Sequence, residues 1–362
     1  MYHDLVFYAL IALITAGLAE CSVKFKGFLN GFFSFTTIFI PSIVSGIRYG
    51  IGTDFLGVYL PEFNFLKFFP DYTSRMEFGY VWLNKLVITL GGGFQLVVFL
   101  VAFITILFIY LAVKQYKDNI SVGLGMLVFM LLYFQLSFNL VRQVAAMGIV
   151  FYALKYIFNR KFWKFCFFIF LAVSFHFSAI LVFPFYFLFY LYGKKEYTWL
   201  SISTFIIMIY VTLNYETLFN PLVLKIGIIS KYEPYLRQTR ALQWSFGILV
   251  RTLPFVLPGI FYYKKMKENH QMLFHFNFVV LGSIIQLTSY MSTNFTSRTG
   301  LYFSLSQIII VPYFFRLGKK HHMTWIGLLV ILSVVFLWYY DFFFIGANQT
   351  VPFQTFLNGY SH

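Results

Sequence analysis

The chain has 362 residues, of which 60% are hydrophobic and only 11% are charged, whereas a water-soluble domain usually carries about 25% charged residues. A folded core cannot hide this much apolar surface from water, so the composition excludes a soluble protein and makes the lipid bilayer a partner. The net charge of +15 would suggest nucleic-acid binding in a soluble protein. Here the basic residues separate apolar runs, as in the cytoplasmic loops of membrane proteins, so we expect no nucleic-acid partner.

Apolar segments of spanning length follow one another along the whole chain. A spanning helix needs about 20 mostly apolar residues. The candidates lie near 5–21, 29–47, 95–113, 120–138, 141–158, 165–191, 199–213, 246–263, 272–290, 300–316 and 324–340. We therefore predict an all-α, polytopic integral membrane protein that forms one domain over residues 1–362, with about 11–12 transmembrane helices.

The segment 165–191 is too long for one untilted span and too short for two full ones. It contains "SFHFSAILVFPF", with His176 near its middle, and basic residues flank it on both sides in "NRKFWK" and "GKKE". If both flanks are cytoplasmic, the segment enters the membrane and returns as two short helices. His176 is then expected near the outer turn of this hairpin.

If this hairpin forms and the N-terminus lies outside, the two sides of the membrane differ in the type of basic residue that their loops carry. The inner loops hold fourteen Lys and two Arg, whereas the outer side holds four Lys and seven Arg. Any cation sets topology, but the planar, permanently charged fork of Arg is preferred for gripping phosphate or carboxylate. This asymmetry predicts an anionic ligand at the outer face. We expect the two long extracytoplasmic loops, 48–94 and 214–245, to cover a cavity there.

The first candidate site is "SGIRYGIGTDF" at residues 45–55, where Arg48 and Asp54 stand among three glycines. Glycine permits a close backbone approach to a ligand, and Arg48 could then face a lipid-linked phosphate. The segment lacks the Gly-Lys-Ser/Thr ending of a nucleotide-binding loop. An ordinary helix end is the other reading, with Arg48 anchored to lipid headgroups and Asp54 capping the next helix.

Two further candidates lie inside apolar segments. "FNLVRQVAAMGIV" places Arg142 and Gln143 at the start of a helix, although a charge at the centre of a spanning helix costs about 2.5–3.5 kcal/mol. Arg142 either binds a ligand or directs its charge toward the membrane surface. His176 stands between two phenylalanines, and it either transfers protons or is a satisfied core residue.

The remaining candidates are charged residues of the outer loops. Arginines recur in "YLRQTRALQWSFGILVR" and "TNFTSRTGLYF", and these are Arg237, Arg240, Arg251 and Arg298. Glu77 in "MEFGY" and Asp54 are the outer carboxylates suited to acid–base chemistry, unless each simply pairs with an arginine. His, Cys and carboxylate residues show no metal-ligand spacing, so we expect neither metal nor cofactor.

Six pieces of the sequence follow one another in this order: "RYGIGTDF", "EFGY", "LVRQVAAMGIVFYALKYIFNRK", "SFHFSAI", "TSRTGLYF" and "TVPFQ". In this order they resemble the EpsG-like branch of the Wzy-type bacterial polysaccharide polymerases. The resemblance covers most of the chain, and its most specific pieces are the Arg-Tyr-Gly-x-Gly-Thr-Asp stretch, the Arg-Gln helix start and the histidine. Residues 214–245 match only in general character.

The resemblance implies a glycosyltransferase in the bacterial cytoplasmic membrane, with a glycosyltransferase-C-like fold and an active site facing outward. Such an enzyme transfers a growing glycan from undecaprenyl diphosphate to a sugar hydroxyl of a new lipid-linked oligosaccharide unit. It also allows a chain-length-regulating protein as a partner.

Within this scheme each candidate residue receives a role. The diphosphate is expected at Arg48, Arg142, Arg251 and Arg298, with Arg237 and Arg240 as secondary choices. Gln143, Tyr49 and Tyr302 are expected to contact the substrate. The proton acceptor is expected to be His176, Glu77 or Asp54.

Two other functions compete with this interpretation. A membrane O-acyltransferase that modifies surface glycans would need a histidine accessible from the cytoplasm, whereas the topology puts His176 outside. A transporter or flippase for lipid-linked sugars would need charges along both halves of a central path. The intramembrane charges gather toward one side instead, which favours the polymerase.

Overall fold

The computed structural model describes residues 2–192, 246–289 and 294–356, together with residues 203, 206 and 210. Within these ranges the chain is helical, and its extended segments form no sheet, only one bridge between Arg48 and Thr355. The α-helices are α1 (Tyr2–Lys24), α2 (Gly27–Ile47), α3 (Leu60–Phe68), α4 (Phe78–Thr89), α5 (Phe94–Lys114), α6 (Val122–Phe129), α7 (Val141–Phe158), α8 (Phe162–Phe175), α9 (Phe185–Tyr192), α14 (Phe246–Phe261), α15 (Tyr263–Met266), α16 (His270–Ser289), α17 (Asn294–Ser304), α18 (Gln307–Lys320) and α19 (Thr324–Tyr339).

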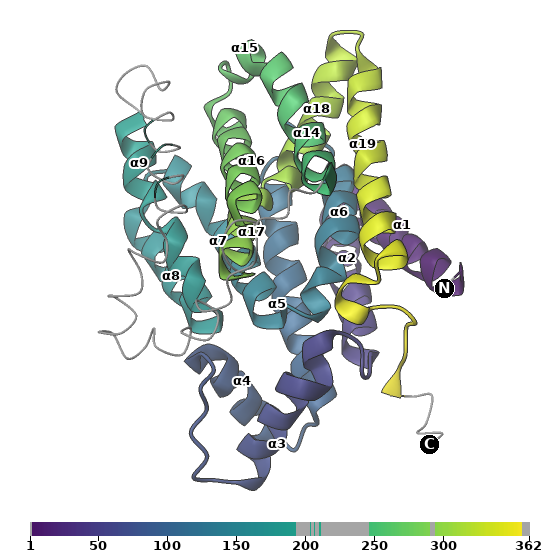
Figure 1. Ribbon diagram of the computed structural model, residues 1–362, viewed down its shortest axis with the longest axis vertical. Coiled ribbons are helices and arrows are strands. Elements are labelled where there is room, and N and C mark those ends of the chain that lie inside the picture. Colours follow the sequence, from purple (N-terminus) through teal and green to yellow (C-terminus); the bar gives the residue numbers. More distant parts are fainter. Residues whose placement is uncertain are drawn as a thin grey trace.

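The longer helices form a bundle, with α3 and α4 at one end and α15 at the other (Figure 1). Among the described residues, six helical segments are long and apolar enough to cross a membrane: Tyr2–Lys24, Gly27–Ile47, Phe94–Lys114, Val141–Phe158, Arg298–Lys320 and Thr324–Phe344. Each apolar segment expected from the sequence coincides with helix, except 199–213, which lies almost wholly outside the described residues. The prediction of an all-α, multi-pass membrane protein is confirmed. The total of about 11–12 spans and the glycosyltransferase-C likeness stay predictions.

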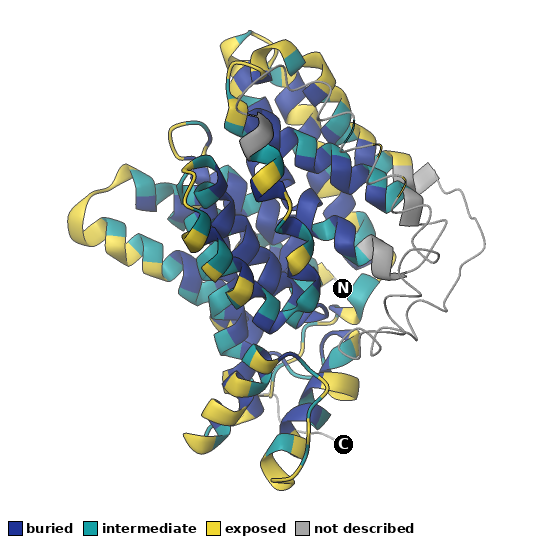
Figure 2. Ribbon diagram, turned by 90° about the vertical axis from the view of Figure 1, so that its left-hand side faces the viewer, coloured by how far each residue is buried: buried dark blue, intermediate teal, exposed yellow. Residues whose placement is uncertain are grey.

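The burial pattern fits a bundle surrounded by lipid. Buried residues fill its middle (Figure 2), and α7 packs against α5, α8 and α17. The closest approach uses a small residue, because a Cβ at Gly148 would lie 3.1 Å from the carbonyl oxygen of Thr105 on α5. By contrast, α19 exposes Leu328, Leu332 and Phe336 on one side. Such an apolar surface is stable facing acyl chains.

The predicted hairpin at 165–191 is confirmed. After α8 the backbone of His176 is extended, and a 3-10 turn (Phe177–Val182) leads into α9. The chain then returns along α8, because Phe162 at the start of α8 packs against Tyr186 of α9 with ring centroids 5.1 Å apart. His176 therefore lies at the turn between two short helices, as expected.

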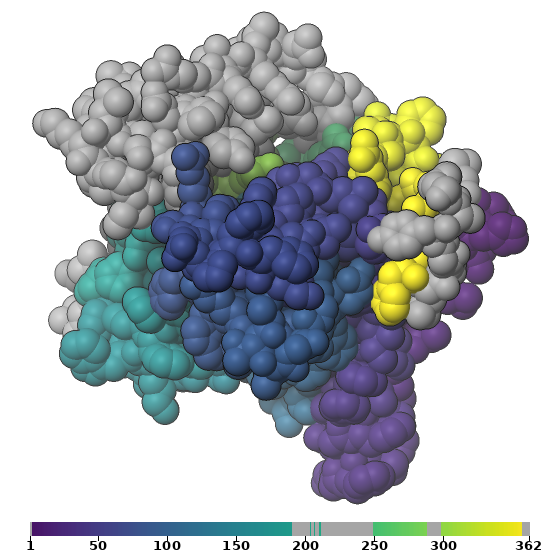
Figure 3. All heavy atoms as spheres, turned by 90° about the horizontal axis from the view of Figure 1, so that it is seen from below, coloured from purple at the N-terminus to yellow at the C-terminus, as the bar shows by residue number. Residues whose placement is uncertain are grey.

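The loop at 48–94 contains helices of its own. A π-helical turn (Phe55–Tyr59) leads into α3, and α4 follows after an irregular stretch. Seen from below, this region lies across the centre of its end of the bundle (Figure 3). Its exposed aromatic side chains include Phe65, Phe68 and Trp82, which suits the membrane–water interface. The second long loop, 214–245, lies outside the described residues.

Candidate functional site

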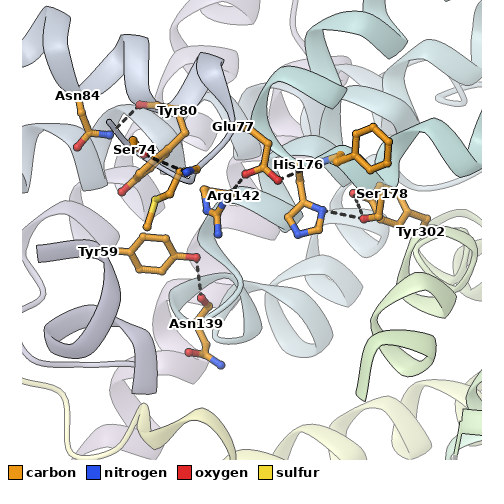
Figure 4. A network of polar contacts seen from close by, with 12 residues as sticks. Tyr59, Ser74, Glu77, Tyr80, Asn84, Asn139, Arg142, His176, Ser178 and Tyr302 are labelled. Atoms are coloured by element: carbon orange, nitrogen blue, oxygen red, sulfur yellow. Dashed lines mark hydrogen bonds and ion pairs between the residues drawn. The ribbon is translucent and has the colours of Figure 1, made fainter. Parts of the chain in front are cut away.

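Four of the residues predicted from the sequence meet at the end of the bundle formed by α3 and α4. Glu77 precedes α4, Arg142 lies in the first turn of α7, and His176 lies at the hairpin turn. Tyr302 reaches the same place from α17 (Figure 4). The fold thus gathers polar groups from four distant parts of the chain into one cluster.

The centre of the cluster is an ion pair between the Arg142 guanidinium and one carboxylate oxygen of Glu77. The Arg142 side chain is 20% exposed, whereas the Glu77 side chain is only 7% exposed. The guanidinium also lies 5.9 Å from the ring centroids of both Tyr59 and Tyr80, whose faces attract a cation. Arg142 is therefore held in place from two directions and keeps part of its surface open.

His176 adjoins this pair through the hairpin backbone. The second carboxylate oxygen of Glu77 accepts a hydrogen bond from the backbone N–H of Phe177 at 3.4 Å. Nδ1 of His176 is 2.7 Å from the Ser178 hydroxyl, which in turn donates to the Tyr302 hydroxyl at 3.1 Å. The imidazole is thus oriented beside a buried carboxylate, as a general base requires (Figure 4).

Gln143 links the ion pair to α17. Its side-chain amide donates to the backbone carbonyl of Arg298 at 2.7 Å. Oε1 of Gln143 and Nε of Arg142 are buried and have no hydrogen-bond partner within the described part of the chain. Buried polar atoms are normally satisfied, so this donor and this acceptor are each open to a ligand, as is the buried Nε of Arg48, which also has no partner among the described residues.

Arg48 occupies a different environment from Arg142. It is only 1% exposed, and its guanidinium donates to the Ser45 carbonyl at 3.0 Å, to the Ser45 hydroxyl and to the Phe138 carbonyl at 3.3 Å. It also lies 4.4 Å from the Phe138 ring centroid. Burial lowers the pKa of Arg48 to about 10, which still leaves the side chain charged at neutral pH. Its role in diphosphate binding stays a prediction, and these contacts favour a scaffold role.

The rest of the glycine-rich segment packs against the C-terminal residues. The backbone N–H of Tyr49 donates to the Gln354 carbonyl at 3.0 Å, and that of Gly52 donates to the Gln349 carbonyl at 3.3 Å. Asp54 is half-buried, and its backbone N–H donates to the Asn139 side chain at 3.1 Å. The expected roles of Tyr49 in substrate contact and of Asp54 in catalysis stay predictions.

Gly52 shows why this segment needs glycine. Its φ is +93°, and a Cβ atom there would lie 2.7 Å from the Phe138 carbonyl oxygen. Gly52→Ala should therefore lower the free energy of unfolding by about 1–2 kcal/mol or more, through backbone strain and the displaced carbonyl. The measurement is thermal unfolding of the purified protein in detergent.

Gly57 supplies a matched control for that change, because it lies in the adjacent π-helical turn with nothing within 4 Å of the site of its Cβ. Gly57→Ala should unfold at the wild-type temperature. Equal unfolding temperatures for Gly52→Ala and the wild type would show that Phe138 can move away without cost.

The other expected arginines divide into two groups. Arg251 on α14 forms an ion pair with Asp341, a residue of the π-helical turn (Tyr340–Phe344) that follows α19. Its expected contact with diphosphate stays a prediction. Arg237 and Arg240 lie outside the described residues. Among the residues described, no group of three or more His, Cys, Asp or Glu side chains could hold a metal ion.

Several partners of the expected site residues were not selected from the sequence: Tyr59, Tyr80, Asn139, Ser178 and Asp341. Asp341 alone carried a signal, since it is a lone charge within the apolar run "LWYYDFFF". The others are neutral residues of common types, and their importance appears only from their contacts.

Comparison with protein families gives a match over most of the chain. The model of the EpsG family matches residues 31–355, which include every residue of the cluster. No curated protein and no solved structure matches the chain. Because the match extends over most of the 362 residues, the chain belongs to the EpsG family.

Proposed function

We propose that this protein is a polysaccharide polymerase that transfers a growing glycan from undecaprenyl diphosphate to a sugar hydroxyl of a new lipid-linked repeat unit. Its membership of the EpsG family supports a role in polysaccharide polymerisation. The observation that carries the finer proposal is the ion pair between Arg142 and Glu77, which lies beside His176 at one end of the bundle. The Glu77 carboxylate is buried, whereas the Arg142 side chain is partly exposed.

The Arg142 guanidinium is the group best suited to the diphosphate. It is permanently charged and presents donors in a planar fork, which matches phosphate oxygens. As the bond between the anomeric carbon and the diphosphate oxygen breaks, negative charge grows on the leaving diphosphate. A fixed cation at that place stabilises the transition state more than the ground state. Nε of Arg142, which has no partner in the described part of the chain, is one donor available for this purpose.

Glu77 is proposed to change partners when the substrate binds. In the free protein its carboxylate accepts from Arg142. Diphosphate oxygens compete for the same guanidinium, and the displaced carboxylate can then accept the proton of the attacking sugar hydroxyl. The hydroxyl oxygen forms the new glycosidic bond, and undecaprenyl diphosphate departs with the electrons of the broken bond. His176, oriented through Ser178, is the second candidate for the base.

The cluster is proposed to face the outside of the cytoplasmic membrane. Residues in or beside three of the basic loops predicted inside meet at the opposite end: Arg316 donates to the Asp118 carbonyl, and Asn269 donates to Asn119 at 3.3 Å. Lys264, Lys265 and Lys267 are at this end too, in and just after α15 (Figure 1). An excess of Lys and Arg on the cytoplasmic side then leaves α3 and α4 outside.

The test is reconstitution of the purified protein in liposomes with undecaprenyl-diphosphate-linked repeat units. The expected products are a ladder of polymers and one released undecaprenyl diphosphate for each new linkage. Movement of the lipid-linked units across the bilayer without polymer would overturn the proposal in favour of a flippase. Acyl transfer to the glycan would overturn it in favour of an acyltransferase.

A further inference from the structure

Asn139 lies just before Arg142 in the chain. Its side chain links its own segment to residues 53–54 and to Asn348. Asn139 is 9% exposed and lies between a 3-10 turn (Leu136–Phe138) and α7. Its side-chain oxygen accepts from the Thr53 hydroxyl and from the backbone N–H of Asp54 at 3.1 Å. Its side-chain nitrogen donates to Oδ1 of Asn348 at 3.3 Å. Both polar atoms of the Asn139 side chain thus make hydrogen bonds, and the residue is nearly enclosed.

The backbone of Asn139 adds a fourth contact, which leads to the ion pair. The Tyr59 hydroxyl donates to the Asn139 carbonyl at 3.3 Å, and burial raises the pKa of this phenol, so it remains a donor. The same Tyr59 ring lies 5.9 Å from the Arg142 guanidinium (Figure 4). One aromatic residue therefore connects Asn139 to Arg142 through space, and only two residues separate them along the chain.

The third partner of Asn139 belongs to a C-terminal strap, defined as residues 346–355. Asn348 lies in this strap with a left-handed backbone at φ 64°. Two contacts fix the strap nearby, because Thr350 accepts from the Tyr8 hydroxyl at 2.8 Å and from the Gln135 amide at 2.9 Å. Asn348 is thus a fixed point of attachment rather than a free loop end.

We propose that Asn139 is a positioning residue whose side chain sets the first turn of α7 and, through it, the place of the Arg142 guanidinium. The proposal rests on the proposed function, in which Arg142 holds the diphosphate. It also gives the glycine-rich segment and the C-terminal strap a shared role, since both attach to this one side chain. A catalytic group displaced by about 1 Å can cost up to about 100-fold in rate.

The first experiment measures polymerisation and the binding of purified undecaprenyl diphosphate for Asn139→Ala and Asn139→Asp. Alanine removes all three side-chain hydrogen bonds, whereas aspartate keeps the two accepted from residues 53 and 54. The expected result is a loss of about 10- to 100-fold in turnover and in binding for Asn139→Ala, with a smaller loss for Asn139→Asp.

Asn269 is a matched control at the other end of the bundle. Its side chain also makes three hydrogen bonds, accepting from the backbone of Gln271 and Met272 and donating to Asn119. Asn269→Ala should lower the unfolding temperature about as much as Asn139→Ala while leaving turnover and binding at wild-type values. Equal losses of turnover in both variants would overturn the proposal, since stability alone would then explain them.

A double-mutant cycle with Arg142→Lys tests whether Asn139 acts through Arg142. If it does, Asn139→Ala should reduce diphosphate binding much less in the Arg142→Lys protein than in the wild type. Fully additive losses would overturn the positioning role. Binding of undecaprenyl diphosphate is measured without polymerisation, so this result stands even if reconstitution gave no polymer, an outcome that would reject the proposed function alone.

Discussion

Arg142→Ala should leave lipid-linked repeat units unpolymerised, with a loss of turnover of about 100- to 1,000-fold. This is the size of effect seen when one preorganised group that stabilises transition-state charge is removed. Arg142→Lys should keep the charge, lose the planar fork and retain an intermediate activity. The measurement is the polymer ladder on gels, together with the initial rate of undecaprenyl diphosphate release from liposomes.

Stability has to be separated from activity in this test. Removing Arg142 takes the cation away from the 7%-exposed Glu77 side chain, and removing one partner of a buried ion pair costs roughly 3–5 kcal/mol. The double variant Arg142→Ala/Glu77→Gln also removes the Glu77 charge, so it should recover much of the lost stability and still make no polymer. Ladders of wild-type length from this double variant would show that Arg142 has no part in the reaction.

Arg316→Ala is the matched arginine control for the same experiment. Arg316 is exposed at the opposite end of the bundle, where it donates to the Asp118 carbonyl. Its removal should leave both the ladder and the rate unchanged. A loss equal to that of Arg142→Ala would mean that positive charge in general, rather than the place of one guanidinium, supports polymerisation.

The helices could be predicted from composition because the bilayer leaves the backbone little choice. Without water, each N–H and C=O must be satisfied within its own segment, so a long apolar run becomes a helix. The hairpin around His176 followed from the same rule combined with the basic residues on both flanks. The loops carry no such constraint, and the path by which the strap brings Asn348 to Asn139 could not have been foreseen.

The charged part of the cluster could be predicted because charge is rare and costly in this chain. Arg142, Glu77 and His176 stood out for that reason, and the fold brings them together. The same criterion could not separate Arg142 from Arg48. What distinguishes them is the surroundings, since Phe138 lies 90 residues from Arg48 in sequence and covers it in space. Asn139 and Tyr59 carried no signal, because neutral residues of these types occur throughout the chain.

Arg48→Ala should lower the stability of the whole protein rather than diphosphate binding alone. The guanidinium makes three hydrogen bonds in a site from which water is excluded, and hydrogen bonds from charged groups contribute about 1.5–3 kcal/mol each to stability. The Phe138 ring adds a desolvated cation–π contact of about 2 kcal/mol. Since burial of the charge offsets part of this, we expect a net loss of about 3 kcal/mol. Thermal unfolding in detergent measures it.

The pattern across substitutions distinguishes a scaffold arginine from one that grips phosphate. Arg48→Lys places a charge at nearly the same position but cannot donate to both Ser45 and the Phe138 carbonyl, so it should unfold almost as easily as Arg48→Ala. Arg75→Ala, in the exposed stretch before α4, should keep wild-type stability. If Arg48 instead grips the diphosphate, Arg48→Ala should unfold at the wild-type temperature and lose binding of undecaprenyl diphosphate. Arg48→Lys should then retain part of that binding, because a lysine ammonium still attracts phosphate as a point charge.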